Sequence, residues 1–478
     1  MKSLTPKQIE AFSGSGLPER GFALERFPLR YYPQGTSAAH LLGYLRRTQT
    51  PGLGRYQANE VAYADYAGAA GLEEALDADL RGAVGGMTIG TTPDGLVRSS
   101  LVNAPAIAGK RIRTTLQWRV QKEVESALDT ISSKEGGGAG GPEAGAAVVI
   151  NVHSGDIVAM ASRPSYDPND FLPAIRAETW NGLSENPALP LFNRGAQEQR
   201  PPGSVFKIVT SLAAMRAGVL DPHKIVETTG FFRVGNVEYR IPDEVGSFDF
   251  REAFAHSINL YFFGLGLKVG RDNLVSTAQD LGVGKPTGFL LPEAAGRMPD
   301  NAFVLATHRR NMGPGDVTNT AIGQGDVLLT PLQMARLSAL VANEGTLYAP
   351  RLVSAIEDAE GNVLEDFPPK LSIVFPMPDQ DWWTLRDAMQ AVTDIGTGHD
   401  IQPAGLRISG KTGTAQVGTK AVPREVVWFT GYVPSDNPEY AFAVMVEGNP
   451  GESIWGGEVA GSLVKRIFSR LYPAATER

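Results

Sequence analysis

The feature that most limits the possible fold is a set of strand-like segments at the two ends of the region after residue 110. Residues 145–162 contain two apolar runs on either side of His153-Ser154-Gly155-Asp156, the pattern of a β-hairpin. Three further strand-like segments follow much later, at 408–417, 425–433 and 440–447. A helical pattern at 459–472 comes last. We therefore expect one antiparallel sheet built from both ends of this region, with helices packed against it.

The chain between these strands has mainly helical patterns. Residues 114–129 carry apolar side chains every four residues, which predicts an amphipathic helix. A second helix is predicted to begin near Ser204, directly after Pro201-Pro202-Gly203. Residues from about 250 to 400 are predicted to be rich in helix, and the glycine-rich segment 136–145 to form a loop. The predicted fold class is therefore α+β, with a central antiparallel sheet flanked by helices.

The length of 478 residues indicates more than one domain, because a single hydrophobic core rarely grows so large. Residues 1–110 contain short elements broken by Gly and Pro and no arrangement of catalytic type. We expect a smaller N-terminal domain over residues 1–110 and a larger domain over residues 111–478.

Composition excludes several classes of function. The chain has no cysteine, so disulfides, thiolate metal sites and a cysteine nucleophile are excluded. Its six histidines lack metal-ligand spacing, and we expect neither a metal nor a cofactor. A net charge of −8 argues against nucleic acid as a ligand. No apolar run of about 18 residues predicts a membrane span, and no apolar core follows Lys2 as in a signal peptide.

The first chemical motif is Ser204-Val-Phe-Lys207, an SxxK pattern at the start of a predicted helix. Residues i and i+3 lie on one helix face, so the Lys207 ammonium can reach the Ser204 hydroxyl. A serine becomes a good nucleophile only when a base takes its proton, and a lysine can do so if burial or a nearby cation lowers its pKa. Lys411 is a candidate for that second cation. The backbone N–H groups near a helix start also suit an oxyanion.

Two further motifs follow. Ser257-Ile258-Asn259 is an SxN pattern, which offers a hydroxyl to relay a proton and an amide to hold a carbonyl. Lys411-Thr412-Gly413-Thr414 lies on a predicted strand. Its lysine and threonines suit a terminal carboxylate, and Gly413 would let a substrate backbone lie close to the strand.

Each motif alone has an ordinary structural explanation. Ser204 would serve as a helix cap with Lys207 in solvent, Ser257 and Asn259 would cap a turn, and the KTGT segment would be an exposed turn. Together and in this order, they supply a nucleophile, a base, a relay and a carboxylate site. The trio SxxK, SxN and KTG is typical of penicillin-binding proteins and class A β-lactamases.

The sequence resembles the class B penicillin-binding proteins over nearly its whole length. Beyond the three motifs, the resemblance rests on Ile322-Gly323-Gln324-Gly325 with the following Thr330–Ala335, and on Trp428–Tyr432. Tyr32-Pro33 with His40-Leu-Leu-Gly43-Tyr44 is most like the elongation-type subgroup. The resemblance implies a serine-acyltransferase domain of the penicillin-binding and β-lactamase-like fold, with a partial N-terminal pedestal of dimerisation type over residues 1–110.

The resemblance also implies roles in acyl transfer. Ser204 would be acylated by the penultimate D-alanine of a peptidoglycan stem peptide, with Lys207 as general base. Ser257, assisted by Lys411, would pass the proton to the leaving amine. The resemblance implies covalent inhibition by β-lactams.

Other residues would bind the substrate. Asn259 would hold the amide of the donor peptide, and Thr412, Gly413 and Thr414 would bind the carboxylate end of D-Ala-D-Ala. The backbone N–H groups of Ser204 and Thr414 would form the oxyanion hole. No metal ligand is implied.

By the same resemblance, the partners would be a polytopic wall glycosyltransferase and shape-determining membrane proteins. The location would be extracytoplasmic, at the periplasmic face of the inner membrane, with an anchor that this chain lacks. A β-lactamase or DD-carboxypeptidase on the same scaffold, and an inactive β-lactam-binding scaffold, stay open as alternatives.

Overall fold

The computed structural model describes residues 6–15, 29–48, 65–83, 85–93, 97–131, 144–235, 237–419 and 422–473. The chain forms two compact units. The first comprises Met1–Arg113, Tyr166–Asn186 and Val353–Phe367, and the second comprises Thr114–Ser165, Pro187–Leu352 and Pro368–Arg478. Most of the predicted loop at 136–145 lies outside the described residues. In the ranges given, no helix is long and apolar enough to cross a membrane.

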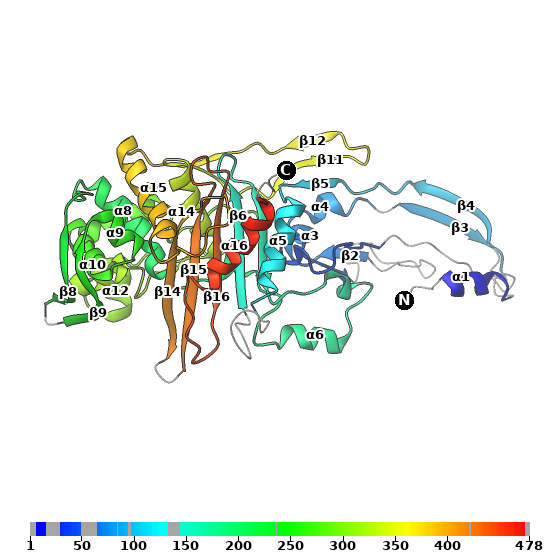
Figure 1. Ribbon diagram of the computed structural model, residues 1–478. Helices are drawn as coiled ribbons and strands as arrows, with labels where there is room; N and C mark the ends of the chain where they lie inside the picture. The colour runs from blue at the N-terminus through cyan, green and yellow to red at the C-terminus, as the bar shows by residue number, and fades with distance from the viewer. Residues whose placement is uncertain are drawn as a thin grey trace. The chain divides into compact units, whose positions relative to one another are not determined.

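The first unit is made of short elements and small sheets (Figure 1). It pairs β1 with β2 and β3 with β4, and a third sheet has the strand order β12-β11-β5. Its elements are α1 (Pro6–Ser13), α2 (Ala39–Leu42), β1 (Leu45–Thr48), β2 (Asp65–Gly68), α3 (Gly71–Ala75), α4 (Asp77–Leu80), β3 (Gly86–Thr91), β4 (Val97–Ala104), β5 (Arg111–Thr114), η3 (Pro168–Phe171), α6 (Ala177–Ser184), β11 (Val353–Glu357) and β12 (Val363–Asp366).

Polar and aromatic contacts between distant segments hold this unit together. The backbone N–H of Tyr32 donates to Asn169 Oδ1 at 3.0 Å, and Asn169 Nδ2 donates to the Tyr32 carbonyl at 2.9 Å. The Tyr32 hydroxyl also donates to Glu73 at 3.1 Å. The rings of Tyr44 and Phe171 stack with their centroids 3.7 Å apart. The Tyr-Pro and Gly-Tyr segments singled out in the sequence therefore help to fix the fold of the first unit.

The second unit is built on a five-stranded antiparallel sheet of the predicted kind (Figure 1). Its strand order is β14-β15-β16-β6-β7, so strands from both ends of the unit pair with each other. The strands are β6 (Ala144–Asn151), β7 (Ile157–Arg163), β14 (Ser409–Thr419), β15 (Val422–Val433) and β16 (Tyr440–Glu447). Because β14 is an edge strand, the KTGT segment lies at one side of the sheet.

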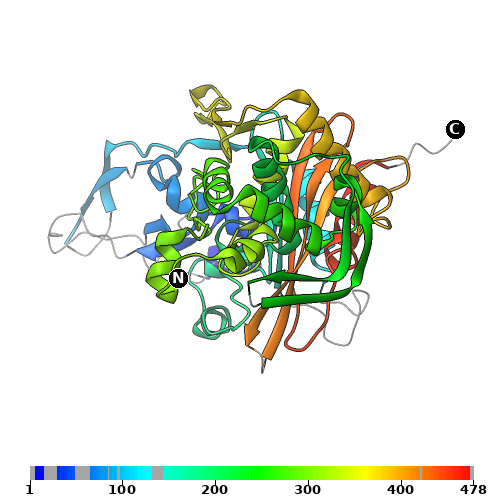
Figure 2. The same ribbon diagram turned by 90° about the vertical axis from the view of Figure 1, so that its left-hand side faces the viewer.

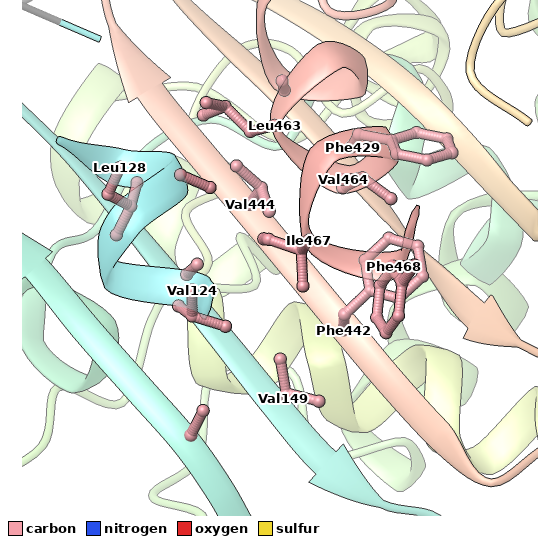
Figure 3. Packing of buried hydrophobic residues seen from close by; sticks show 14 of the residues in the cluster. Val124, Leu128, Val149, Phe429, Phe442, Val444, Leu463, Val464, Ile467 and Phe468 are labelled. Atoms are coloured by element: carbon pink, nitrogen blue, oxygen red, sulfur yellow. The ribbon is translucent and has the colours of Figure 1, made fainter. Parts of the chain in front are cut away.

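Helices cover both faces of this sheet. Figure 3 shows α5 (Trp118–Leu128) and α16 (Val459–Leu471) on one face, where the cluster of buried side chains includes Val124, Phe442 and Phe468. Helix α14 (Pro331–Ala342) packs against β6, β15 and β16 and is buried along its whole length. Because helices cover both faces of the sheet, β6, β7, β15 and β16 contain continuous apolar runs, whereas the edge strand β14 carries the polar KTGT segment.

The rest of the second unit contains the helices that were predicted between the strands. It also contains a long hairpin that was not predicted. The hairpin pairs β8 (Val226–Val234) with β9 (Val237–Phe248) and packs on α10 (Figure 2). The other elements are α7 (Arg194–Gln197), η4 (Gly203–Phe206), α8 (Lys207–Arg216), α9 (Phe250–Ala255), α10 (Asn259–Val269), α11 (Arg271–Asp280), α12 (Asn301–His308), α13 (Pro314–Ala321), β10 (Thr346–Tyr348), β13 (Leu371–Val374) and α15 (Asp379–Asp394).

Two predicted helix starts differ from the observed ones. The helix expected over 114–129 begins only at Trp118, because the N–H groups of Thr115 and Gln117 bond to distant carbonyls of Leu352 and Val158. The helix expected near Ser204 begins as the single 3₁₀ turn η4 and becomes α-helical at Lys207.

Candidate active site

The turn that carries Ser204 lies directly against the edge strand β14. Gly203, the residue before Ser204, has a left-handed φ of 54°. A Cβ at this position would lie 2.6 Å from the carbonyl oxygen of Thr414 and 3.4 Å from its amide nitrogen. Only glycine fits both the dihedral angle and this approach. The backbone of Ser204 is therefore held next to that of Thr414.

Hydrogen bonds from two other segments fix the same turn. The backbone N–H of Gly203 donates to the carbonyl of Gly323 at 3.0 Å. The buried indole N–H of Trp428 on β15 donates to the carbonyl of Pro201 at 3.0 Å. The Ile322–Gly325 and Trp428–Tyr432 stretches, which the sequence analysis noted without a role, thus support the turn that carries Ser204.

Lys207 is fully buried and lies in a cluster of oxygen acceptors. Its Nζ donates to the Ser257 carbonyl at 2.6 Å, to the Ser257 hydroxyl at 3.1 Å and to Asn259 Oδ1 at 2.7 Å. These three acceptors match the three N–H groups of an ammonium. Among the described residues, these bonds go to the SxN segment, while Ser204 lines the cavity beside it. The structure thus joins the first two motifs directly.

Two effects favour the neutral form of Lys207, although its three acceptors and the nearby aromatic ring suit the ammonium form. Burial lowers the pKa of Lys207 well below its usual value, and the nearby charge of Lys411 lowers it further, while the charge of Glu244 raises it. The centre of the Phe262 ring lies 5.2 Å from Nζ. A lowered pKa increases the share of the neutral amine, which is the form that a general base needs.

The SxN segment forms the link between α9 and α10. Ser257 has φ 61°, a left-handed conformation that is uncommon for a residue with a side chain. Asn259 begins α10, and its backbone N–H donates to Glu244 Oε1 at 2.8 Å. The N–H of Leu260 donates to the other oxygen of Glu244 at 2.7 Å. Glu244 therefore holds the start of the helix that carries Asn259.

Lys411 on β14 is also fully buried, but it has fewer partners. Its Nζ donates to the Thr412 carbonyl at 3.3 Å, and the Phe254 ring centre lies 5.7 Å away. Burial lowers the pKa of Lys411 to about 7. Near neutral pH this side chain is thus present in both charged and neutral forms.

The three residues that follow Lys411 shape the side of the site. The hydroxyls of Thr412 and Thr397 lie 2.6 Å apart, and the Gly456 N–H donates to the Thr414 hydroxyl at 3.4 Å. A Cβ at Gly413 would lie 2.8 Å from both the Pro202 carbonyl oxygen and a methyl of Val205. Glycine at this position thus lets the turn that carries Ser204 pack closely on the strand.

Many of these groups line one cavity of about 880 Å³ in the second unit. The predicted site residues that line it are Ser204, Ser257, Asn259, Thr412, Gly413 and Thr414. Lys207 and Lys411 lie buried beside it. Of the further lining residues, Glu244, Thr397 and the exposed Trp455 lie outside every predicted motif, and no sequence pattern pointed to them.

Comparisons with known proteins agree with this geometry. A family model of the penicillin binding protein transpeptidase domain matches residues 145–469, and one of the penicillin-binding protein dimerisation domain matches residues 1–114. The peptidoglycan D,D-transpeptidase MrdA of Haemophilus influenzae is 30% identical, over 98% of this chain and 73% of that protein. The chain belongs to the class B penicillin-binding proteins, and it is a peptidoglycan D,D-transpeptidase, a serine-type acyl-transfer enzyme.

Two solved structures are similar as well. The complex of PBP2 with MreC from Helicobacter pylori has a TM-score of 0.78 and 27% identity, over 99% of this chain and 84% of that one. The ceftriaxone acyl-enzyme of penicillin-binding protein A from M. tuberculosis has a TM-score of 0.73 and 26% identity, over 92% of each chain. The predicted family, fold class and enzyme class are confirmed, and so is the likeness to the elongation-type subgroup, whose members are named MrdA and PBP2.

Proposed function

We propose that this enzyme cross-links peptidoglycan during cell-wall elongation, with Ser204 as the nucleophile that carries the acyl group. The observation that supports this proposal most is the cluster around Lys207. A fully buried amine with a lowered pKa bonds to the SxN segment beside the cavity that Ser204 lines. A nucleophile, a base and a relay hydroxyl are then within one small region.

In the acylation step, the Ser204 oxygen attacks the carbonyl carbon of the penultimate D-alanine, and neutral Lys207 takes the hydroxyl proton. The backbone N–H groups of Ser204 and Thr414 donate to the oxyanion of the tetrahedral intermediate. The C–N bond then breaks, and the terminal D-alanine leaves with a proton from the Ser257 hydroxyl. Lys207 returns a proton to Ser257 across their 3.1 Å contact, and the nearby charge of Lys411 favours this loss from Lys207.

Substrate binding would use the other side of the cavity. The Asn259 amide holds the donor peptide's amide, and the hydroxyls of Thr412 and Thr414 bind the terminal carboxylate, near the charge of Lys411. Gly413 keeps the strand close to the turn of Ser204. In the second step, an amine of a neighbouring stem peptide attacks the acyl carbon, and Ser204 regains its proton as it leaves.

The proposed function also implies that β-lactams inhibit this enzyme and that it has protein partners in cell-wall synthesis. A β-lactam would acylate Ser204 as its ring opens, which the ceftriaxone acyl-enzyme of the similar M. tuberculosis protein supports. The complex of the similar H. pylori protein with MreC supports a shape-determining membrane protein as one partner. A polytopic wall glycosyltransferase would be the other, and the work of this enzyme would be done outside the cytoplasmic membrane.

The first test is intact-protein mass spectrometry after incubation with benzylpenicillin. We expect the wild type to gain the mass of one drug molecule and Ser204→Ala to gain none. Ser276→Ala is the matched control, because Ser276 is exposed on α11, and this variant is expected to react as the wild type does.

The other outcomes separate the alternatives. Rapid hydrolysis of the drug without an adduct would indicate a β-lactamase on this scaffold. Intact drug without an adduct would indicate an inactive binding scaffold. An adduct that survives in Ser204→Ala would move the nucleophile to another residue.

A further inference from the structure

The β8–β9 hairpin brings a buried carboxylate to the catalytic cluster. Glu244 on β9 is 8% exposed and lines the cavity. Both of its oxygens accept backbone hydrogen bonds, from the N–H of Asn259 at 2.8 Å and the N–H of Leu260 at 2.7 Å. Hydrogen bonds from N–H groups to a carboxylate are among the stronger ones in proteins. The hairpin is thus tied to the first turn of α10.

The position of Asn259 depends on that tie. The first N–H groups of a helix have no partner within the helix, and Glu244 supplies the partner for two of them. The side chain of Asn259 accepts from Lys207 Nζ at 2.7 Å. A shift in the start of α10 would therefore move one of the three acceptors of the buried lysine.

The charge of Glu244 acts on the same lysine. The charged groups that act on Lys207 are Lys411 on β14 and Glu244 on β9. Helix α10 presents only the amide of Asn259 and the ring of Phe262. At the end of α9, the exposed His256 also lines the cavity. Glu244 is thus the carboxylate that offsets the effects of burial and of Lys411 on this amine.

We propose that Glu244 is a positioning residue for acyl transfer, which fixes Asn259 at the start of α10 and sets the charge balance around Lys207. This inference rests on the proposed function of Ser204 and Lys207. It gives the hairpin, which carries no motif, a part in the reaction. Glu244 acts through Asn259 and Lys207 and needs no contact with the substrate.

The test is the pH dependence of the acylation rate with a fluorescent penicillin, from about pH 5 to 10. Glu244→Gln removes the negative charge and one acceptor. Without that charge the ammonium form of Lys207 is less favoured, so the rise of the rate with pH should move to lower pH by roughly half a unit or more. The plateau rate should fall about tenfold, because Asn259 is held less firmly. Asp243→Asn, at the exposed neighbouring position of β9, should change neither value.

Glu244→Asp separates charge from geometry. It keeps the charge but is one methylene shorter, so we expect a lower plateau with an unshifted midpoint. An unshifted midpoint in Glu244→Gln would overturn the electrostatic role. If Glu244→Gln does not fold, as judged by circular dichroism, an unchanged plateau in Glu244→Asp would overturn the positioning role. Absence of acylation in the wild type, or its persistence in Ser204→Ala, would instead contradict the proposed function itself.

Discussion

Lys207 and Lys411 are both fully buried, yet the two regions that hold them offer very different surroundings to an ammonium. At the start of α8, Lys207 has three oxygen acceptors within 3.1 Å, all from the SxN segment. On β14, Lys411 has the carbonyl of Thr412 at 3.3 Å and the face of an aromatic ring. Equal burial is thus combined with unequal hydrogen bonding.

The difference shows how one site can use two lysines for two tasks. In the proposed mechanism, the acceptors of Lys207 would help it to hold the proton of Ser204, and burial with Lys411 nearby would favour the release of that proton. Lys411 has less to stabilise its charge, and burial brings its pKa to about 7. Lys411 thus acts on the pKa of Lys207, while burial alone accounts for the pKa of Lys411, and separate substitutions should have different consequences.

The largest effect is expected from Lys207→Ala. Without the base, the Ser204 proton has no acceptor of matched pKa, and the acylation rate constant should fall roughly 10²- to 10⁴-fold. The measurement is the second-order rate constant with a fluorescent penicillin. Lys370→Ala, at an exposed position, is the control and should react normally. A loss of less than tenfold would mean that another group takes the proton.

Lys411→Met should stabilise the fold at low pH while it impairs activity. Folding lowers the pKa of Lys411 from its usual 10.5 to about 7, so below pH 7 the folded enzyme bears the full cost of a buried ammonium. Methionine has a similar size and no charge, and the gain in unfolding free energy should be on the order of 3–5 kcal/mol at pH 6. Between pH 7 and 10.5 the wild type folds with loss of a proton, so its stability rises with pH and the gain should shrink.

Urea unfolding of both proteins at pH 6 and pH 10 measures the difference in unfolding free energy between Lys411→Met and the wild type. The exposed Lys370→Met should leave the stability unchanged at either pH. If this difference is the same at both pH values, the added stability of Lys411→Met comes from packing and not from removal of the buried charge. The contrast between the two buried lysines would then lose its electrostatic basis.

Much of the fold was predictable because most of its sheet strands contain apolar runs of suitable length and its closing helix has apolar residues at helical spacing. The five-stranded sheet and α16 lie within a few residues of their predicted positions. The β8–β9 hairpin was not predicted, since most of its side chains are partly or fully exposed and give no apolar alternation. Its packing on α10 is beyond the range of a local pattern, whereas the Gly235-Asn236 pair between its strands is a typical hairpin turn sequence that the sequence reasoning missed.

The site residues also fall into those that a local sequence pattern predicts and those that only the tertiary structure reveals. Ser204, Lys207, Ser257, Asn259 and Lys411 were named from three short motifs whose order is informative. The environment of the two lysines was not predictable, because it depends on residues far away in the sequence, such as Ser257 beside Lys207 and Phe254 beside Lys411. Glu244 belongs to no motif and is recognised only from its contacts. Motifs thus predict the reactive groups, and only the tertiary structure identifies the groups proposed to position them.

The smallest effect is expected from Thr397→Val. This variant changes the surroundings of Thr412, next to Lys411, and leaves those of Lys207 unchanged. The hydroxyls of Thr397 and Thr412 lie 2.6 Å apart, so Thr397 orients a group proposed to bind the substrate carboxylate. Loss of one such hydrogen bond costs about 1 kcal/mol, which would weaken penicillin binding roughly fivefold. The limiting acylation rate should stay within about twofold, because the surroundings of Lys207 are unchanged. The dependence of the observed rate on drug concentration gives both values, with Thr384→Val on α15 as control. A slower limiting rate with unchanged binding would mean that Thr397 acts on the chemical step and does not help Thr412 to bind the carboxylate.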